Sequence, residues 1–212
     1  MIKNVIFDLD GTLLDTREGI VESVRHAANA LGYRELPYAE LLTFVGPPIQ
    51  QSFIDHYGCD AETAQRAADI FRDYYKTAAL LKATPYEGIF DLCGELKKRG
   101  IRMAVATYKR EDYALILLKH FRFDDYCDPM HGADGQNKLK KRDIVQLCME
   151  EMGASPDDTV LIGDTEHDAK GAREAGIHFL AVTYGFGFRT AAEAGECLGA
   201  VGTPMEIADC LL

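Results

Sequence analysis

Two acidic side chains lie close together near the start of the chain. Asp8 and Asp10 follow the short apolar run of residues 5–7, which is typical of a buried strand, and Gly11 comes directly after them. Because side chains on an extended chain alternate with a period of two, both carboxylates are expected on the same side where the strand ends. Two acids this close repel each other unless a cation lies between them, and Mg²⁺ suits carboxylate oxygens. The spacing therefore predicts an acidic, magnesium-binding site.

Two further apolar runs end in polar residues that suit phosphate chemistry. Residues 103–106 are followed by Thr107, and residues 160–162 are followed by Gly163 and Asp164. Parallel strands of one sheet present their carboxyl ends at one edge, so side chains far apart in the sequence can meet there. Thr107 also fits a helix cap and Asp164 a turn, but their joint placement favours one crevice built from three segments.

The elements that would position these residues alternate from Pro85 onward. The pattern of strands and helices in turn indicates βαβ units and a parallel sheet. Strands are expected over residues 101–106, 127–130, 159–162, 178–182 and 200–201, and helices over 87–99, 112–121, 141–152, 169–175 and from 204 onward. Right-handed crossovers then give a three-layer, doubly wound, Rossmann-like α/β core.

The chain between the first strand and Pro85 shows only helical patterns. Helices are expected over residues 18–31, 37–44, 49–57 and 60–81, with Thr16 and Asp60 as caps of the first and last. The sequence therefore predicts a core of residues 1–15 and 85–212, with an all-helical cap domain of residues 16–84 inserted into it. Hinges are expected near residues 15–16 and 84–86.

The composition is that of an ordinary globular chain. It has 212 residues, 47% of them hydrophobic and 27% charged, and a net charge of −11. This charge argues against nucleic acid as a partner, because binding to phosphate backbones depends on Lys and Arg. The apolar runs are too short to span a bilayer and no signal-peptide pattern opens the chain, so no membrane partner and a cytoplasmic location are expected. The six cysteines lack a CxxC pair and are expected to be reduced.

Residues 8–13, Asp-Leu-Asp-Gly-Thr-Leu, resemble the first motif of the haloacid dehalogenase superfamily, in its phosphatase branch. The resemblance implies that Asp8 is the nucleophile and Asp10 the general acid and base. Residues 107–109 resemble the second motif, which implies that the Thr107 hydroxyl donates to the transferring phosphoryl group. Tyr108 stands where related phosphatases commonly have Asn.

The third motif is a Lys near the start of a later helix, and three residues are candidates. Lys138, Lys140 and Lys141 all lie in this part of the chain. Lys141 falls in the first turn of the helix expected over residues 141–152 and resembles the family position best. The usual Lys-Pro dipeptide is absent, so the register among the three lysines stays open.

Residues 163–168 resemble the fourth motif of the family, whose acids bind Mg²⁺. The resemblance implies a Mg²⁺ ion held by Asp8, the Asp10 carbonyl and Asp164, with Asp168 as a further ligand or as the partner of the active-site lysine. With this motif the resemblance covers nearly the whole chain in the right order. It is closest to the phosphoglycolate phosphatase-like subgroup, whose members carry a helical cap.

The function that the resemblance implies is Mg²⁺-dependent hydrolysis of a small phosphate monoester through an aspartyl-phosphate. A small phosphorylated metabolite would be the substrate, and the helical insertion would act as a lid. Substrate contacts are expected from Gly11, Tyr108, Lys109 and Gly46. Gly46 belongs to a Gly-Pro-Pro segment similar to that of phosphoglycolate phosphatase-like members, but it also fits a simple turn between helices.

Three other classes of protein share part of this motif pattern. A phosphosugar mutase shares the first motif and the cap, and nothing in the sequence separates it from a phosphatase. A receiver-type signalling module also uses clustered Asp, Thr and Lys, but it is shorter and lacks the inserted helices. A haloacid dehalogenase shares the fold but needs neither Asp10 nor Mg²⁺. Phosphoglycolate, a sugar phosphate, a nucleotide and pyrophosphate all stay open as substrates, as do a monomer and a homodimer.

Overall fold

The computed structural model describes residues 1–134 and 138–211. The chain divides into two compact units, one formed by Met1–Asp15 with Pro85–Leu212 and the other by Thr16–Thr84. Two short strands, β2 (Leu14–Asp15) and β3 (Thr84–Pro85), form a two-stranded sheet at the points where the chain passes from one unit to the other. Each unit has its own packing and is described by itself.

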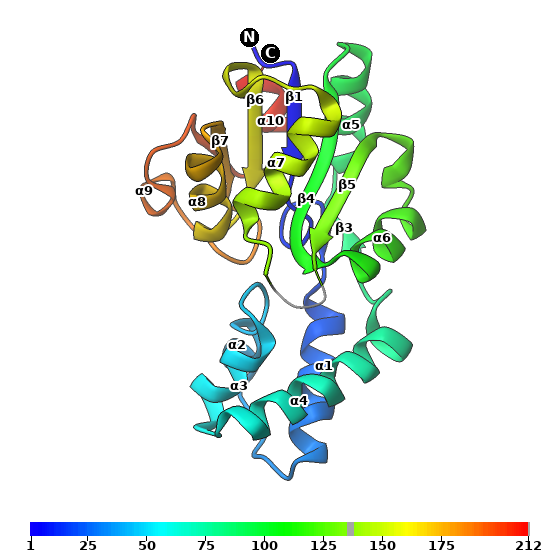
Figure 1. The fold of residues 1–212 in the computed structure, drawn as a ribbon, viewed down its shortest axis with the longest axis vertical. Coiled ribbons are helices and arrows are strands. Elements are labelled where there is room, and N and C mark those ends of the chain that lie inside the picture. Colours follow the sequence, from blue (N-terminus) through cyan, green and yellow to red (C-terminus); the bar gives the residue numbers. More distant parts are fainter. Residues whose placement is uncertain (135–137, 212) are drawn as a thin grey trace. The chain divides into compact units, whose positions relative to one another are not determined.

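A six-stranded parallel sheet forms the centre of the first unit (Figure 1). The strands lie in the order β5-β4-β1-β6-β7-β8, so β1 lies between β4 and β6 and the order reverses at β1. Their bounds are β1 (Asn4–Phe7), β4 (Arg102–Arg110), β5 (Cys127–Ala133), β6 (Thr159–Gly163), β7 (His178–Val182) and β8 (Ala200–Val201). This confirms the predicted doubly wound sheet, whose ligands bind at the carboxyl edge beside the reversal point.

Helices cover the sheet of the first unit. They are α5 (Ile89–Lys98), α6 (Glu111–His120), α7 (Lys141–Met152), α8 (Glu166–Ala175), α9 (Ala191–Ala194) and α10 (Pro204–Leu211), with 3₁₀ turns η2 (Phe123–Asp125) and η3 (Pro156–Asp158). Ile6 and Leu161 pack with Ile144 in a buried cluster that includes α7 and α8. Val5 and Phe7, which point to the opposite face, are also fully buried. Residues 5–7 of β1 and 160–162 of β6 are therefore all apolar, because both faces of these strands are covered.

Several elements differ from the predicted bounds. β4 continues through Thr107 to Arg110, because pairing with β5 extends to Ala133. α8 begins at Glu166 instead of residue 169, because Thr165 and Asp168 form a capping box that starts the helix earlier. The short helix α9 and the 3₁₀ turns carry too little periodic signal to be predicted.

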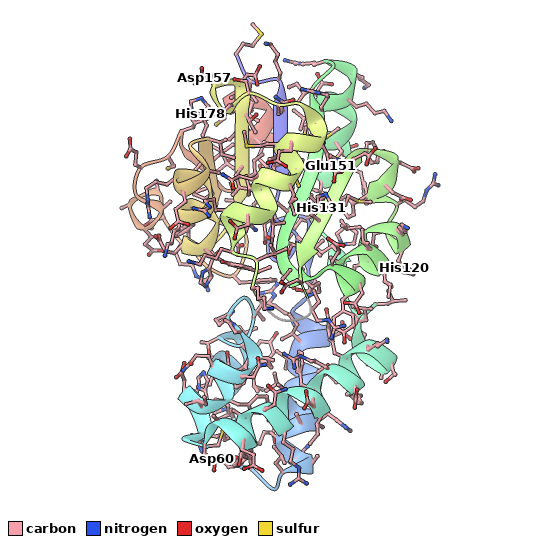
Figure 2. The ribbon with its side chains drawn as sticks, in the orientation of Figure 1. Asp60, His120, His131, Glu151, Asp157 and His178 are labelled. Carbon is pink, nitrogen blue, oxygen red and sulfur yellow. The ribbon has the colours of Figure 1, made fainter. Side chains whose placement is uncertain are left out.

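The second unit consists of helices. They are α1 (Arg17–Ala30), α2 (Tyr38–Leu42), α3 (Ile49–Tyr57), α4 (Ala61–Tyr74) and the π-helical turn η1 (Tyr75–Ala79). Asp60 caps α4, as predicted, by accepting a hydrogen bond from Thr63 N at 2.8 Å (Figure 2). α1 and α4 have 14 residues each, and nowhere in the part of the chain that the structure describes is a helix both long and apolar enough to cross a bilayer.

The central strands should dominate the stability of the first unit. Leu161→Ala removes a fully buried side chain from β6 and should lower the free energy of unfolding by about 2–5 kcal/mol. Leu198→Ala makes the same substitution at a side chain that is 52% exposed, and it should change the free energy of unfolding by less than about 0.5 kcal/mol. Urea denaturation of the full chain measures both, and equal effects would contradict the assignment of the core.

Candidate active site

The first acidic motif lies at the carboxyl end of the central strand. Asp8 directly follows β1, its N–H donates to Ile162 O at 2.9 Å, and its side chain is buried. Gly11 has a φ of 83°, a left-handed conformation that favours glycine, and Gly11 N donates to Leu14 O. A Cβ at Gly11 would also collide with the Asp164 carboxylate. Gly11 therefore lets the turn after Asp10 pass close to the second acidic motif.

One buried lysine joins two of the carboxylates. Lys141, the first residue of α7, is 2% exposed, and its Nζ lies 2.6 Å from Asp8 Oδ1 and 2.6 Å from Asp168 Oδ1. The other two candidate lysines, Lys138 and Lys140, are exposed. The structure therefore brings Lys141, the lysine preferred from the sequence, to the predicted nucleophile.

Asp168 uses both of its carboxylate oxygens within the protein. Oδ1 pairs with Lys141, and Oδ2 accepts hydrogen bonds from Thr165 N at 3.1 Å and Thr165 Oγ1 at 2.6 Å. The bond from Thr165 N is one half of the capping box of α8, in which the Thr165 side chain also accepts from the Asp168 backbone N–H, so the start of this helix and the direction of the Lys141 side chain depend on the same residue. Of the two roles left open for Asp168, its contacts favour holding the lysine.

Asp164 is held differently, by main-chain amides from a distant segment. Its Oδ2 accepts hydrogen bonds from Phe186 N at 2.6 Å and Gly187 N at 3.1 Å, whereas its Oδ1 is buried without a hydrogen-bond partner. Gly185 lies so close that a Cβ there would collide with the Asp164 carboxylate. Sequence reasoning missed this segment. The alternating Gly-Phe-Gly-Phe that follows β7 was the available signal.

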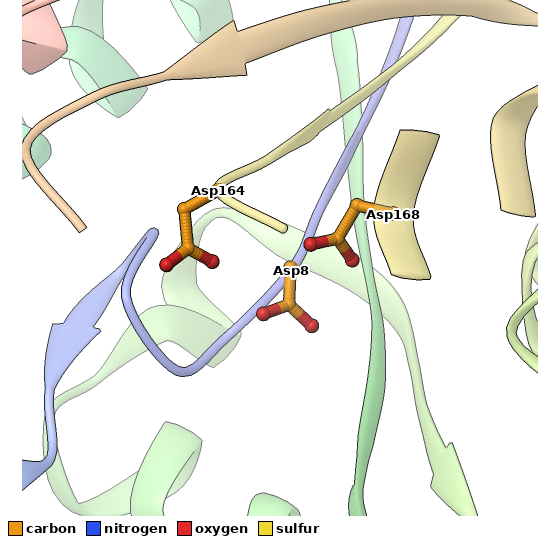
Figure 3. A group of neighbouring side chains, drawn as sticks. All are labelled: Asp8, Asp164 and Asp168. Atoms are coloured by element: carbon orange, nitrogen blue, oxygen red, sulfur yellow. The ribbon is translucent and has the colours of Figure 1, made fainter. Parts of the chain in front are cut away.

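Three carboxylates come together in this way. Asp8, Asp164 and Asp168 each offer one oxygen, and these oxygens lie within 4.8 Å of one another (Figure 3). The unpaired, buried Oδ1 of Asp164 needs an electropositive partner, because a buried acceptor without one is costly. Carboxylate oxygens are the donors that Mg²⁺ prefers, so the residues fit this ion. The Asp10 carboxylate is not in this group, and the expected contribution of the Asp10 carbonyl to the ion stays a prediction.

Burial governs the electrostatics of these groups. Loss of water raises the pKa of Asp8 to about 7, and repulsion from Asp168 and Asp10 adds to the rise while the Lys141 ammonium opposes it. Burial and the charges of Asp168 and Asp8 raise the pKa of Asp164 to about 8, against its two amide donors. Burial disfavours the charge on Lys141, but its two carboxylate partners outweigh this and raise its pKa. One ammonium, that of Lys141, faces three carboxylates, and a bound cation would supply the positive charge that is missing.

The second motif lies beside the first. Lys109 Nζ lies 2.9 Å from Asp10 Oδ1 and 3.0 Å from Asp10 Oδ2, and Lys109 N donates to Thr107 Oγ1 at 3.1 Å. Thr107 is 1% exposed. Lys109 was expected to contact substrate, but its ammonium is paired with Asp10, the predicted general acid and base.

The last two candidate residues, Tyr108 and Gly46, belong to different units of the chain. Tyr108 is 38% exposed, and its ring meets the His167 ring edge-on, with centroids 5.4 Å apart and an interplanar angle of 84°. Gly46 belongs to the Thr16–Thr84 unit, in the segment before α3, and has a φ of 104°. The structure therefore does not group Gly46 with the residues of the first unit.

An acidic cluster, a buried lysine and a buried hydroxyl at the carboxyl edge of a doubly wound sheet define a phosphate ester hydrolase of the α/β class. The chain matches the family model described as haloacid dehalogenase-like hydrolase over residues 5–182, and it belongs to this family. The predicted superfamily is thus confirmed.

Similar proteins point to the same class of enzyme. A 5'-nucleotidase of Pseudomonas aeruginosa is 36% identical over 186 residues, which cover 87% of this chain and 84% of that protein. A phosphoglycolate phosphatase of Nitrosospira multiformis is 31% identical over 194 residues, covering 87% and 85%. The crystal structure of a predicted phosphatase from Clostridium acetobutylicum has a TM-score of 0.89 and 36% identity, and the match covers 99% of this chain and 97% of that one. The predicted likeness to phosphoglycolate phosphatases and the enzyme class, a phosphoric ester hydrolase, are confirmed.

Gly171→Ala adds one methyl group to α8 and tests whether activity depends on the close approach of this helix to Lys141. A Cβ at Gly171 in α8 would lie 2.5 Å from Lys141 Cγ, so Gly171→Ala should displace the ammonium and lower turnover of a phosphate monoester by about 10²-fold. Gly94→Ala in α5 is the matched control, because no atom lies within 4 Å of its Cβ position. It should keep activity and raise stability by about 1 kcal/mol. Steady-state kinetics and thermal denaturation measure both, and full activity of Gly171→Ala would contradict the assignment.

The raised carboxyl pKa values predict how pH and Mg²⁺ affect stability. Between about pH 4 and pH 8 the folded chain holds more protons on Asp8 and Asp164 than the unfolded chain, so stability without metal should fall as pH rises through this range. Mg²⁺ competes with these protons and should therefore raise the Tm more at pH 8 than at pH 6. At about 100 times its Kd the ion should stabilise the fold by about 2.7 kcal/mol.

Thermal denaturation with EDTA and with added MgCl₂ measures this effect. Asp164→Asn should reduce the Mg²⁺-induced shift, whereas Asp91→Asn, the same change at an exposed position in α5, should leave it intact. A shift of wild-type size in Asp164→Asn would show that the ion binds elsewhere.

Proposed function

We propose that this enzyme is a Mg²⁺-dependent phosphatase that hydrolyses a small phosphate monoester through an aspartyl-phosphate on Asp8. The observation that carries the proposal is the position of the Asp8 carboxylate. It is buried at the reversal point of the sheet and paired with Lys141, and one of its oxygens lies within 4.8 Å of a carboxylate oxygen of Asp164. A carboxylate needs no activating base at neutral pH, and such a site supplies positive charge to the phosphoryl group that it attacks.

The reaction has two halves, in which Asp8 and Asp10 have separate roles. In the first, an Asp8 oxygen bonds to phosphorus, the bond from phosphorus to the leaving oxygen breaks, and Asp10 gives that oxygen its proton. In the second, Asp10 takes a proton from a water molecule that attacks phosphorus, and inorganic phosphate leaves Asp8. Two observations support this assignment: Lys109 Nζ holds both oxygens of the Asp10 carboxylate, and the charge of Asp10 is near enough to raise the pKa of Asp8.

The other residues would orient the phosphoryl group and offset its negative charge. Lys141 and the Thr107 hydroxyl are proposed as donors to its oxygens, and Asp168 as the residue that positions Lys141. Asp8, Asp164 and the Asp10 carbonyl would hold Mg²⁺, which would supply positive charge to phosphate bound beside the nucleophile.

The helical unit is proposed as a cap that closes over substrate and limits the access of water. The unit boundaries at residues 15–16 and 84–85 coincide with the hinges expected from the sequence. Gly46 stays the substrate contact proposed for this unit. We place the enzyme in the cytoplasm, as a monomer or homodimer acting on a small phosphorylated metabolite, and phosphoglycolate is the first substrate to examine.

Replacement of the nucleophile tests the proposal. Asp8→Asn should lower Mg²⁺-dependent release of inorganic phosphate from p-nitrophenyl phosphate by on the order of 10³-fold or more, because the amide cannot form the acyl phosphate. Asp91→Asn is the matched surface control and should retain wild-type turnover. Undiminished turnover by Asp8→Asn would rule out this nucleophile. Transfer of the phosphoryl group to a sugar phosphate, without release of inorganic phosphate, would indicate a mutase instead.

A further inference from the structure

Two exposed rings meet above the carboxyl end of the central strand. Tyr108 lies in β4 and His167 in the first turn of α8, directly after β6. Because β1 lies between β4 and β6, a contact between these two residues passes across the end of β1, where Asp8 lies. Their ring centroids are 5.4 Å apart, Tyr108 is 38% exposed and His167 is also exposed. The rings therefore lie at the carboxyl edge of the sheet, where the candidate active site is.

Each ring is attached next to a residue that holds the reacting groups. Tyr108 lies between Thr107 and Lys109, and Lys109 holds the Asp10 carboxylate. His167 precedes Asp168, which holds Lys141. The backbone thus ties the two rings to the groups that would surround a phosphoryl group and its leaving oxygen.

The charges beside the rings favour an uncharged leaving group. The Lys109 ammonium is only 8% exposed and already meets the Asp10 carboxylate, whose exposure is 15%. A leaving group with its own carboxylate, such as glycolate, would have to compete with Asp10 for this cation. A leaving group with a neutral, flat ring would instead cover the exposed face of Tyr108, and stacking of this kind is favourable for every nucleobase.

We propose that Tyr108 and His167 form a stacking surface for the leaving group, and that this surface selects monoesters of ring-bearing alcohols, such as nucleoside 5'-monophosphates, over phosphoglycolate. The proposal rests on the proposed phosphatase function and adds its substrate class. Asn has no ring to stack, so Tyr108→Asn removes this contact.

The ratio of kcat/KM for adenosine 5'-monophosphate to that for phosphoglycolate tests the proposal. In the wild-type enzyme the ratio should exceed about 10. Tyr108→Asn and His167→Ala should each lower it, Tyr108→Asn by about 10-fold and mainly through KM, because the ring binds the leaving group and does not react. Tyr108→Phe keeps the ring and should keep the ratio within about twofold.

Tyr126→Asn is the matched control for the loss of a ring. Tyr126 precedes β5, at the amino edge of the sheet, and its ring lies 6.1 Å from that of Phe90. This variant should keep the wild-type ratio. A ratio that Tyr108→Asn leaves unchanged, or an equal loss on both esters, would overturn the stacking surface, since a purely structural contact affects both substrates alike.

A binding measurement distinguishes failure of the stacking surface from failure of the proposed phosphatase activity. If the wild-type enzyme with Mg²⁺ releases phosphate from neither ester nor from p-nitrophenyl phosphate, the phosphatase proposal fails. Calorimetric titration with adenosine 5'-monophosphate then still tests the surface. Affinity about 10-fold weaker in Tyr108→Asn and unchanged in Tyr126→Asn supports it, and equal affinity in all three proteins overturns it.

Discussion

The ion pairs of one buried lysine with two carboxylates are the interaction on which the rest of this site depends. A charged group inside a protein is costly unless opposite charges and hydrogen bonds surround it. Lys141 meets Asp8 and Asp168, Asp168 in turn meets Thr165, and the start of α8 is part of the same network. The packing of α7 and α8 over the sheet and the position of the candidate nucleophile are therefore stabilised by the same contacts. Loss of Lys141 would leave the buried carboxylates of Asp8 and Asp168 without their shared counter-charge.

Small residues and main-chain amides complete the arrangement. Gly11, Gly171 and Gly185 stand where a Cβ would collide with Asp164 or Lys141, so the close approach of distant segments depends on their lack of a side chain. The amides of Phe186 and Gly187 fix one oxygen of Asp164 and leave the other for a ligand. Fixed amide donors of this kind need no reorganisation when a charged ligand arrives.

The sequence was enough to predict the sheet and the acids, because apolar runs that end in Asp8 and Asp164 carry a clear local pattern. The start of a helix favoured Lys141 but left Lys138 and Lys140 open, because all three lie within four residues of one another. The amide donors of Phe186 and Gly187 were missed because the Gly-Phe-Gly-Phe pattern indicates a loop but does not show which carboxylate its main-chain amides contact. The contact of Lys109 with Asp10 depends on a strand that continues through Thr107, which pairing with β5 decides and local propensity does not.

The loop after β7, whose Phe186 and Gly187 amides bind Asp164, makes assembly of the site depend on the order of synthesis of the chain. Asp164 is synthesised well before Phe186 and Gly187, so on the ribosome its carboxylate lacks these donors until the segment after β7 has emerged. Asp8 and Lys141 are 133 residues apart and must likewise wait for most of the core. Contacts of such long sequence separation form late in folding and carry a large loop-closure entropy. A nascent chain of this protein therefore acquires its acidic centre only when nearly the whole core is present.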